Sequence, residues 1–156
     1  GVTNDAHHMT APRPDGTKAA LAMRKALAMA GTEPSEVDHI NAHGSSTPLN
    51  DSTESQAVRA VFGGAADGVP VTATKPFHGH ALGASGAVEA AVVSLSIQRG
   101  WIPPVINLQE PGEGCDLDYV TGSGLVEEVG TVLSNSFGFG GINASLVMTR
   151  PPPSTD

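Results

Sequence analysis

The 156-residue sequence contains few charged side chains, few aromatic side chains and a single cysteine. Charged residues make up 15% and hydrophobic residues 39% of the chain, so its composition argues against disorder and suits one domain with a substantial core. The single cysteine, Cys115, excludes an internal disulfide and fits a reducing cytosol, so we expect a cytoplasmic location.

The sequence also lacks long hydrophobic runs and positively charged stretches. No apolar run reaches the length of a membrane span, and no charged-then-apolar leader opens the sequence, so we predict neither a membrane span nor a secretory signal. The formal net charge is −8. Because an acidic chain without a basic stripe repels the phosphates of nucleic acids, we expect no nucleic-acid partner.

Helical and strand patterns alternate along most of the chain and then give way to a pair of strands. The pattern predicts helices over residues 16–30, 50–63 and 83–100, and strands over residues 37–42, 69–75, 130–136 and 142–150. This order is typical of an α/β architecture with a partly mixed sheet.

Several local signals refine this prediction. Asp51 and Glu54 have the spacing of a capping box at the start of the second helix. The helix over 83–100 is apolar on nearly all sides, which predicts a buried helix. Residues 1–4 suggest the end of a strand whose beginning is absent, so the chain is expected to be part of a larger body. The Pro-rich tail, residues 150–156, is expected to be loose.

Two histidines stand where ligands collect in α/β proteins. His43 and His80 each follow a predicted strand and precede a Gly-rich turn. Ligands gather beyond the carboxyl ends of the strands in such sheets. The segment SNSFGFGG, residues 134–141, would bring backbone N–H groups to the same edge, where they could stabilise an oxyanion. Two imidazoles and a backbone donor suit chemistry that develops negative charge on a carbonyl oxygen.

Other readings of these residues stay open. His78 and His80 form an H-x-H pair that, on an extended strand with His43 nearby, is a conceivable metal site. Lys75 is either a solvated charge or a residue that tunes His80, and Glu89, inside an apolar helix, would need a partner such as Lys75. His7, His8 and His39 are interpreted as structural or surface residues, and Cys115 as a partly packed thiol.

Three segments, taken together, resemble a known family. NAHGSSTPLND, TKPFHGHALGASGAVEA and SNSFGFGGINASLV occur in the order and spacing of the C-terminal half of β-ketoacyl-acyl carrier protein synthases, the elongating condensing enzymes of fatty acid and polyketide synthesis. The resemblance covers residues 1–149. It implies the C-terminal half of a thiolase-like layered fold, with a mixed five-stranded sheet and helices on both faces, usually within a homodimer of complete synthases.

The resemblance also implies roles for particular residues. His43 and His80 match the two active-site histidines, which stabilise the enolate and thioester oxygens while malonyl-carrier protein decarboxylates. Lys75 and Glu89 match a paired lysine and glutamate, and Phe139 matches a gating residue whose backbone N–H helps to form the oxyanion hole. The hydroxyls that hold the pantetheine arm match Ser45 and Thr47. No cofactor is implied, because phosphopantetheine of the acyl carrier protein carries the substrates.

The chain departs from the family pattern in one decisive respect. The family's nucleophilic cysteine lies in the N-terminal half, and Cys115 does not fall in such a motif, so a partner portion must supply the nucleophile. In the segment TKPFHGH, Pro76 and His78 also differ from the residues of the commoner Lys-Ser-x-x-Gly-His motif. Three hypotheses remain: the C-terminal portion of a ketosynthase, a non-catalytic chain-length-factor-like partner or scaffold fragment, and a metal-binding module.

Overall fold

The computed structural model describes residues 1–152 and contains a mixed five-stranded sheet. The strand order is β1-β7-β6-β2-β3, in which β6, β2 and β3 run parallel, whereas β7 is antiparallel to both β6 and β1. The bounds of these strands are Val2–Asn4 for β1, His39–Asn41 for β2, Val71–Thr72 for β3, Thr131–Gly138 for β6 and Ile142–Thr149 for β7.

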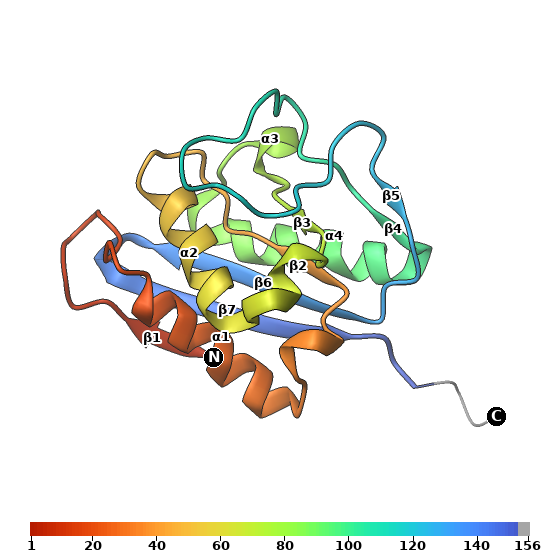
Figure 1. Cartoon of the computed structure of the whole chain (residues 1–156), viewed down its shortest axis with the longest axis horizontal. Helices are drawn as coiled ribbons and strands as arrows, with labels where there is room; N and C mark the ends of the chain where they lie inside the picture. The colour runs from red at the N-terminus through yellow and green to blue at the C-terminus, as the bar shows by residue number, and fades with distance from the viewer. Residues whose placement is uncertain (153–156) are drawn as a thin grey trace.

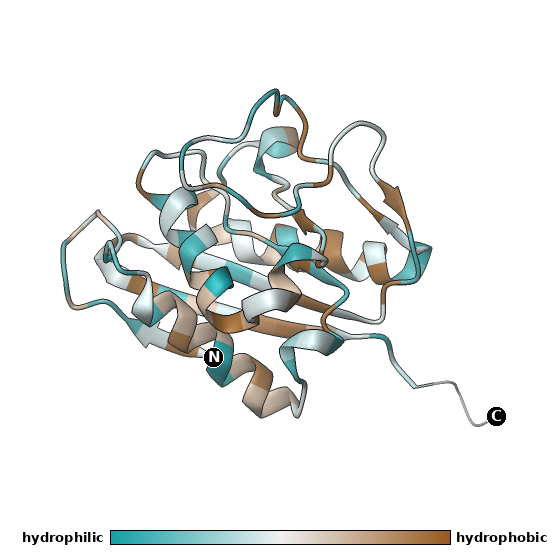
Figure 2. Ribbon diagram, in the orientation of Figure 1, coloured by the Kyte–Doolittle hydropathy of each residue, from teal (hydrophilic) through white to brown (hydrophobic). Residues whose placement is uncertain are grey.

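Helices cover both faces of this sheet, as the family resemblance implies (Figure 1). The helices α1 (Thr17–Ala30) and α2 (Asn50–Phe62) pack on one face, where Met23, Val58 and Leu133 lie fully buried in the larger core cluster. The helix α4 (Ser85–Arg99) packs on the other face. Figure 2 shows hydrophobic residues on the strands that lie between these helices. The expected α/β layered fold is therefore confirmed.

The boundaries of the predicted helices agree closely with the structure. Gly31 ends α1 with a φ of 65°, a left-handed conformation that glycine adopts without strain. Gly63 follows α2, as predicted. The predicted capping box is wrong: the start of α2 carries no side-chain cap hydrogen bond, because Asp51 and Glu54 accept hydrogen bonds from the loop after β2 instead.

The prediction of a buried helix over 83–100 holds for one face of this helix only. Residues Leu82–Ala84 form a separate 3-10 turn, and α4 begins at Ser85. Val93 and Ile97 are buried against the sheet, but Leu95 is 44% exposed on the opposite side. The helix thus buries one face in this chain and presents a second apolar face outward.

The predicted strand over 69–75 is much shorter in the structure. After β3 the chain turns into the short helix α3 (Lys75–His78), so His78 and His80 do not lie on an extended strand. Pro76 occupies the first turn of α3, a position that needs no backbone N–H donor. A small antiparallel two-stranded sheet of β4 (Trp101–Ile102) and β5 (Leu125–Val126) was not expected from the sequence.

The two long strands β6 and β7 are joined by the 3-10 turn Phe139–Gly141, as the glycine-rich FGFGG segment predicts. Gly141 has a φ of 72°, and a Cβ atom there would lie 2.8 Å from the Cβ of Asp5. Glycine is therefore required where this turn passes β1. Of the expected loose tail, residues 153–156 lie outside the described residues.

Candidate functional site

His43 and His80 meet at the carboxyl-end edge of the parallel strands. His43 follows β2, and His80 follows α3, which lies above this edge (Figure 1). Their ring centroids are 5.5 Å apart and the rings are nearly perpendicular, at 75°. The expectation that both imidazoles reach the same sheet edge is confirmed.

His43 is a buried imidazole in a partly apolar environment. Its side chain packs against Phe137, with ring centroids 5.8 Å apart, and the residue is 6% exposed. Burial, reinforced by the positive charge of Lys75 and by the neighbouring His80, lowers the pKa of His43 to about 3. His43 is therefore neutral at physiological pH and presents one ring N–H rather than a full cation.

Hydrogen bonds fix the tautomer of His80. Its Nδ1 accepts the backbone N–H of Leu82 at 3.2 Å and lies 2.9 Å from the hydroxyl of Ser85 at the start of α4. Since Nδ1 is an acceptor, the neutral ring carries its proton on Nε2. His80 thus keeps an N–H donor on the side of the ring away from the α4 terminus.

A buried ion pair lies beside the two imidazoles. Lys75 is 6% exposed and Glu89 is fully buried, and their Nζ and Oε1 atoms are 2.5 Å apart. The same Nζ donates to the backbone carbonyl of His43. The sequence prediction that Lys75 is the partner of Glu89 is confirmed. The ammonium group of Lys75 is thus held next to the backbone of His43.

The remaining predicted site residues occupy loops around the histidines. Ser45 and Thr47 follow His43, and their hydroxyl oxygens lie 3.0 Å apart. Phe139 is 73% exposed in the turn after β6, and among the described contacts it is Phe137, not Phe139, that packs on His43. The role of the Phe139 backbone N–H stays a prediction.

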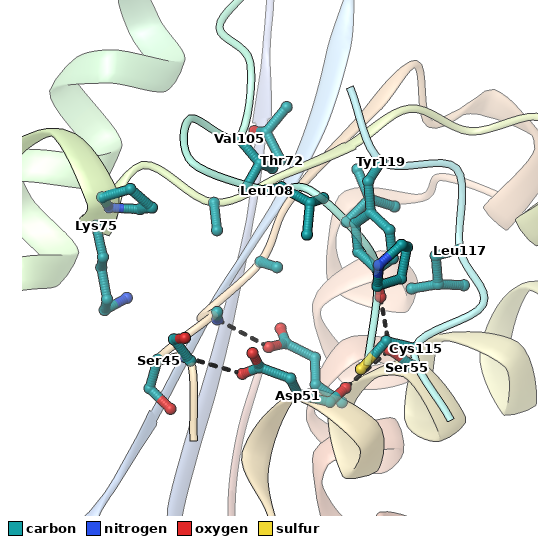
Figure 3. Close-up of a pocket in the computed structure, with 18 of the residues that line it drawn as sticks. Ser45, Asp51, Ser55, Thr72, Lys75, Val105, Leu108, Cys115, Leu117 and Tyr119 are labelled. Carbon is teal, nitrogen blue, oxygen red and sulfur yellow. Dashed lines mark hydrogen bonds between the residues drawn. The ribbon is translucent and has the colours of Figure 1, made fainter. Parts of the chain in front are cut away.

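A cavity of about 470 Å³ opens beside this cluster. Figure 3 shows Lys75 and Ser45 on one side of the cavity and Leu117, Tyr119 and Cys115 on the other. Burial raises the pKa of Tyr119 to about 12, so its hydroxyl stays protonated and hydrogen-bonds with Ser55 at 2.9 Å. Cys115 is half-buried and lies across the cavity from Lys75, in keeping with its interpretation as a partly packed thiol.

His78 is the third histidine of the metal site that the sequence left open, but its ring nitrogens contact other groups. Its two ring nitrogens lie 2.7 Å from the carbonyl of Gly79 and 3.3 Å from the hydroxyl of Thr74. Within residues 1–152, no group of three or more His, Cys, Asp or Glu side chains is arranged to hold a metal ion. The same residues contain no helix that is both long and apolar enough to cross a membrane.

Sequence reasoning missed two residues that contact His43 directly. Phe137 packs on its ring, and Glu54, buried on α2, accepts its backbone N–H. The alternation of side chains along β6 could have placed Phe137 near the site. The spacing of Asp51 and Glu54 gave only a capping signal, so nothing local pointed from Glu54 to a loop eleven residues earlier.

Two imidazoles and a buried lysine at one strand edge define a site for carbonyl chemistry. Imidazole N–H donors that are held in place stabilise negative charge on a carbonyl or enolate oxygen. The comparisons with known proteins agree with this class of site. Residues 1–109 match the family described as "Beta-ketoacyl synthase, C-terminal domain", and the chain belongs to this family.

Curated relatives and solved structures extend the match to nearly the whole chain. The chain is 46% identical over 150 residues to the 3-oxoacyl-[acyl-carrier-protein] synthase 2 of Coxiella burnetii, and 46% identical over 149 residues to that of Synechocystis. It is also similar to a type II polyketide ketosynthase solved with its acyl-carrier protein, at 40% identity and a TM-score of 0.93, with 97% of this chain and 37% of that chain covered. The ishigamide ketosynthase/chain length factor gives 39% identity and a TM-score of 0.92 over similar shares.

The match covers only part of each relative. The aligned region is 96% of this chain but 36% of the length of the two curated synthases. The chain thus spans a little over a third of the length of these relatives, and the match does not extend to the rest of them.

Proposed function

We propose that the chain is the C-terminal catalytic portion of a β-ketoacyl-acyl carrier protein synthase. The observation that carries this proposal is the adjacent pair of His43 and His80, with the buried ion pair of Lys75 and Glu89 beside it. The reaction is a decarboxylative Claisen condensation, which joins a malonyl thioester to an acyl thioester. The acyl group is held on a cysteine of an N-terminal portion, which is outside this chain.

The two histidines act in the decarboxylation step of this proposal. The bond between the malonyl α-carbon and its carboxylate breaks, carbon dioxide leaves, and the electron pair passes to the thioester as an enolate. The N–H groups of His43 and His80 donate to the oxygen that becomes negative. Because His43 is neutral and buried, it donates without first losing a hydration shell.

The enolate carbon then attacks the acyl thioester carbon, and the cysteine leaves as a thiolate. We propose that the backbone N–H of Phe139 donates to the oxyanion of this second step, because the Phe139–Gly141 turn follows β6 at the same sheet edge. Ser45 and Thr47 would hold the pantetheine arm, since Ser45 lines the cavity and the two hydroxyls already lie together. The acyl carrier protein is the proposed partner, and the substrates need no resident cofactor.

The alternative is a non-catalytic partner similar to a chain length factor. Some solved relatives are complexes of a ketosynthase with its chain length factor. A partner that does not catalyse has no need for two adjoining imidazoles and a buried lysine bound to a histidine carbonyl. Their joint presence favours the catalytic portion.

The test compares the chain with a complete synthase, by which we mean this chain joined to a portion that supplies the nucleophilic cysteine. Each is incubated with acyl- and malonyl-carrier protein, and β-ketoacyl product and carbon dioxide are measured. We expect no condensation product from the chain alone, because no acyl-enzyme can form without the nucleophile, and product from the complete synthase. Robust product from the chain alone, or none from the complete synthase, would contradict the proposal.

Intact-mass analysis of the purified material is the accompanying control. It shows whether a cysteine-bearing portion copurifies, and thus whether any activity belongs to this chain. We predict that the complete synthase forms a dimer and is located in the cytoplasm.

A further inference from the structure

His78 departs from the commoner family motif and has no role in the function proposed above. It is the last residue of α3, the four-residue helix that begins at Lys75 above the sheet edge (Figure 1). His80 follows this helix by one residue. His78 therefore lies in the short connection between two residues of the proposed site.

The backbone of His80 has little support of its own. Within residues 1–152, neither its N–H nor its carbonyl forms a hydrogen bond, and only its imidazole is bonded, through Nδ1. The backbone of His43 differs, because its N–H donates to Glu54 and its carbonyl accepts from Lys75. The direction in which the side chain of His80 leaves the backbone therefore depends on the residue before it, Gly79.

Gly79 has a backbone conformation that is open essentially to glycine alone, with a φ of 77° and a ψ of 176°. Because glycine has no Cβ, the peptide group after it rotates easily unless a contact holds it. The N–H of Gly79 donates to the carbonyl of Lys75 at 2.8 Å, which fixes only the peptide group before Gly79. The peptide group between Gly79 and His80 needs a contact of its own.

The side chain of His78 supplies that contact. Its Nδ1 lies 2.7 Å from the carbonyl oxygen of Gly79, and its Nε2 lies 3.3 Å from the hydroxyl of Thr74. A carbonyl oxygen can only accept, so Nδ1 carries a proton and donates it, and in the neutral ring Nε2 accepts from the hydroxyl of Thr74. Thr74 is buried two residues after β3, so it anchors the far side of the ring to the end of the sheet.

We propose that His78 is a positioning residue for His80. Its Nδ1–H holds the carbonyl of Gly79 and so fixes the peptide group from which the His80 imidazole projects toward the developing enolate oxygen. A preorganised donor loses much of its effect when it is displaced by a fraction of an ångström, so this contact should affect the decarboxylation rate. The inference rests on the proposed function for its chemistry, whereas the hydrogen bond itself is a feature of this chain.

The experiment compares His78→Asn with His78→Gln in the complete synthase. The amide nitrogen of asparagine is as many bonds from the backbone as Nδ1, so it can donate to the carbonyl of Gly79. The amide of glutamine lies one bond further out, where it can replace only Nε2 and its contact with Thr74. Both substitutions put a neutral amide at an exposed position, so a difference between them reports the donor to Gly79.

The two variants should differ in rate and not in substrate affinity. We expect kcat for malonyl decarboxylation to fall at least about fivefold in His78→Gln with KM changed less than about twofold, and His78→Asn to stay within about twofold of wild type. His78→Ala removes the same donor and replaces His78→Gln if that variant does not fold. Equal rates in the asparagine and glutamine variants would overturn the inference.

A double variant tests whether His78 acts through His80. In a His80→Ala background, His78→Gln should slow decarboxylation by less than about twofold more, because the imidazole that it positions is gone. A loss by the same factor in both backgrounds would show that His78 acts independently of His80, and the inference would then fail.

Hydrogen exchange gives a readout that does not depend on activity. The N–H of Leu82 donates to Nδ1 of His80 at 3.2 Å, so its protection reports how firmly His80 is held. Measured by mass spectrometry on the complete synthase, amides in residues 79–84 should exchange faster in His78→Gln than in His78→Asn. If wild type releases no carbon dioxide, the proposed function fails, yet this comparison still tests the contact; equal exchange in the two variants would refute it.

Discussion

Each histidine of the adjoining pair offers one N–H donor, so each can be tested by removing it. We predict that His43→Ala and His80→Ala in the complete synthase each slow malonyl decarboxylation by about 100- to 1000-fold, the typical cost of losing one preorganised donor. Acyl transfer to the cysteine should suffer less in His43→Ala. The measurement is single-turnover release of carbon dioxide from malonyl-carrier protein.

His7→Ala serves as the control, because His7 is exposed in the loop after β1. It should decarboxylate at nearly the wild-type rate. The assignment fails if the two site variants fold well, by melting, and still release carbon dioxide as fast as wild type.

The ion pair of Lys75 and Glu89 is predicted to matter in two separable ways. Lys75→Met leaves the buried carboxylate of Glu89 without a partner, which typically costs ~3–5 kcal/mol of stability. Lys75→Met combined with Glu89→Met removes both charges and should recover most of that loss. It should not recover decarboxylation, because the carbonyl of His43 still lacks its donor.

Urea unfolding and carbon dioxide release, measured on the single and double variants, distinguish these effects. Recovery of both stability and rate in the double variant would show that Lys75 acts only by neutralising Glu89.

Two buried histidines make stability depend on pH in a defined direction. Burial lowers the pKa of His39 to about 4 and that of His43 to about 3, below the 6.5 of an unfolded histidine. Both rings are neutral when folded and take up protons on unfolding, so their contribution is present above pH 6.5 and is lost as the pH falls towards 4. Each contributes up to about 1.4 kcal/mol per pH unit in this window.

His39→Gln isolates this effect, since His39 bonds Thr72 and takes no part in the proposed chemistry. Between pH 6 and pH 5, the unfolding free energy should change less steeply with pH than in wild type. The difference in slope should correspond to the uptake of up to one proton fewer on unfolding. An unchanged slope would mean that His39 is not neutral in the folded protein.

Sequence reasoning found some of these residues for physical reasons and missed others. His43 and His80 could be placed at one edge because strand ends in a parallel sheet converge, and Lys75 was the nearest cation to a glutamate in an apolar helix. Glu54 was missed because its partners lie on a loop and on β6, and only tertiary structure brings those donors together. Their precise roles came from the family resemblance, not from spacing.

At the scale of elements, the loop after β2 passes β3 very closely. Gly44 has a φ of 47°, and a Cβ atom there would lie 2.4 Å from the Cβ of Ala73. We predict that Gly44→Ala displaces this loop, lowers stability by more than about 1 kcal/mol and reduces decarboxylation, because His43 precedes it.

Gly79→Ala is the matched control. Gly79 also has a positive φ, of 77°, but nothing lies within 4 Å of the position its Cβ would take. Its variant therefore bears the backbone strain without the steric overlap. Melting temperatures of the two variants measure the difference, and equal destabilisation would mean that the contact with Ala73 is readily relieved.

The elements themselves were predictable to different degrees. The helices α1 and α2 and the pair β6 and β7 follow strong local patterns, and the structure contains them all. The strand predicted over residues 69–75 was too long, because Lys75 and the residues after it form α3 above the sheet edge. Short elements such as β4 and β5 have too few residues for a periodic pattern.

For the whole molecule, an apolar surface on the α4 side of the sheet is the main consequence of the fold. Leu95 on α4 is 44% exposed, and Val2, Ile142 and Leu146 on the strands are 63%, 53% and 54% exposed. Several exposed apolar side chains on one side of the sheet favour an interaction surface there. We predict that the isolated chain associates or melts without cooperativity, measured by sedimentation and calorimetry.

Substitution tests whether this surface is responsible. Leu146→Thr combined with Leu95→Gln should increase the soluble monomer. Met29→Gln should not, although Met29 is 84% exposed, because it is an isolated residue on α1. A sharp, cooperative melt of the unaltered monomeric chain would disprove the prediction.

The two outer strands of the sheet differ in their protection against aggregation. Beside β3, the backbone of Val71 accepts from Val120 and donates to Asp118, so the loop after β4 occupies that border. Within residues 1–152, β1 pairs only with β7, which leaves its other border free of a strand partner. Intermolecular β-pairing, the first step towards fibrils, is therefore directed to the β1 border, and peptides that mimic a strand would attach there before anywhere else on the sheet.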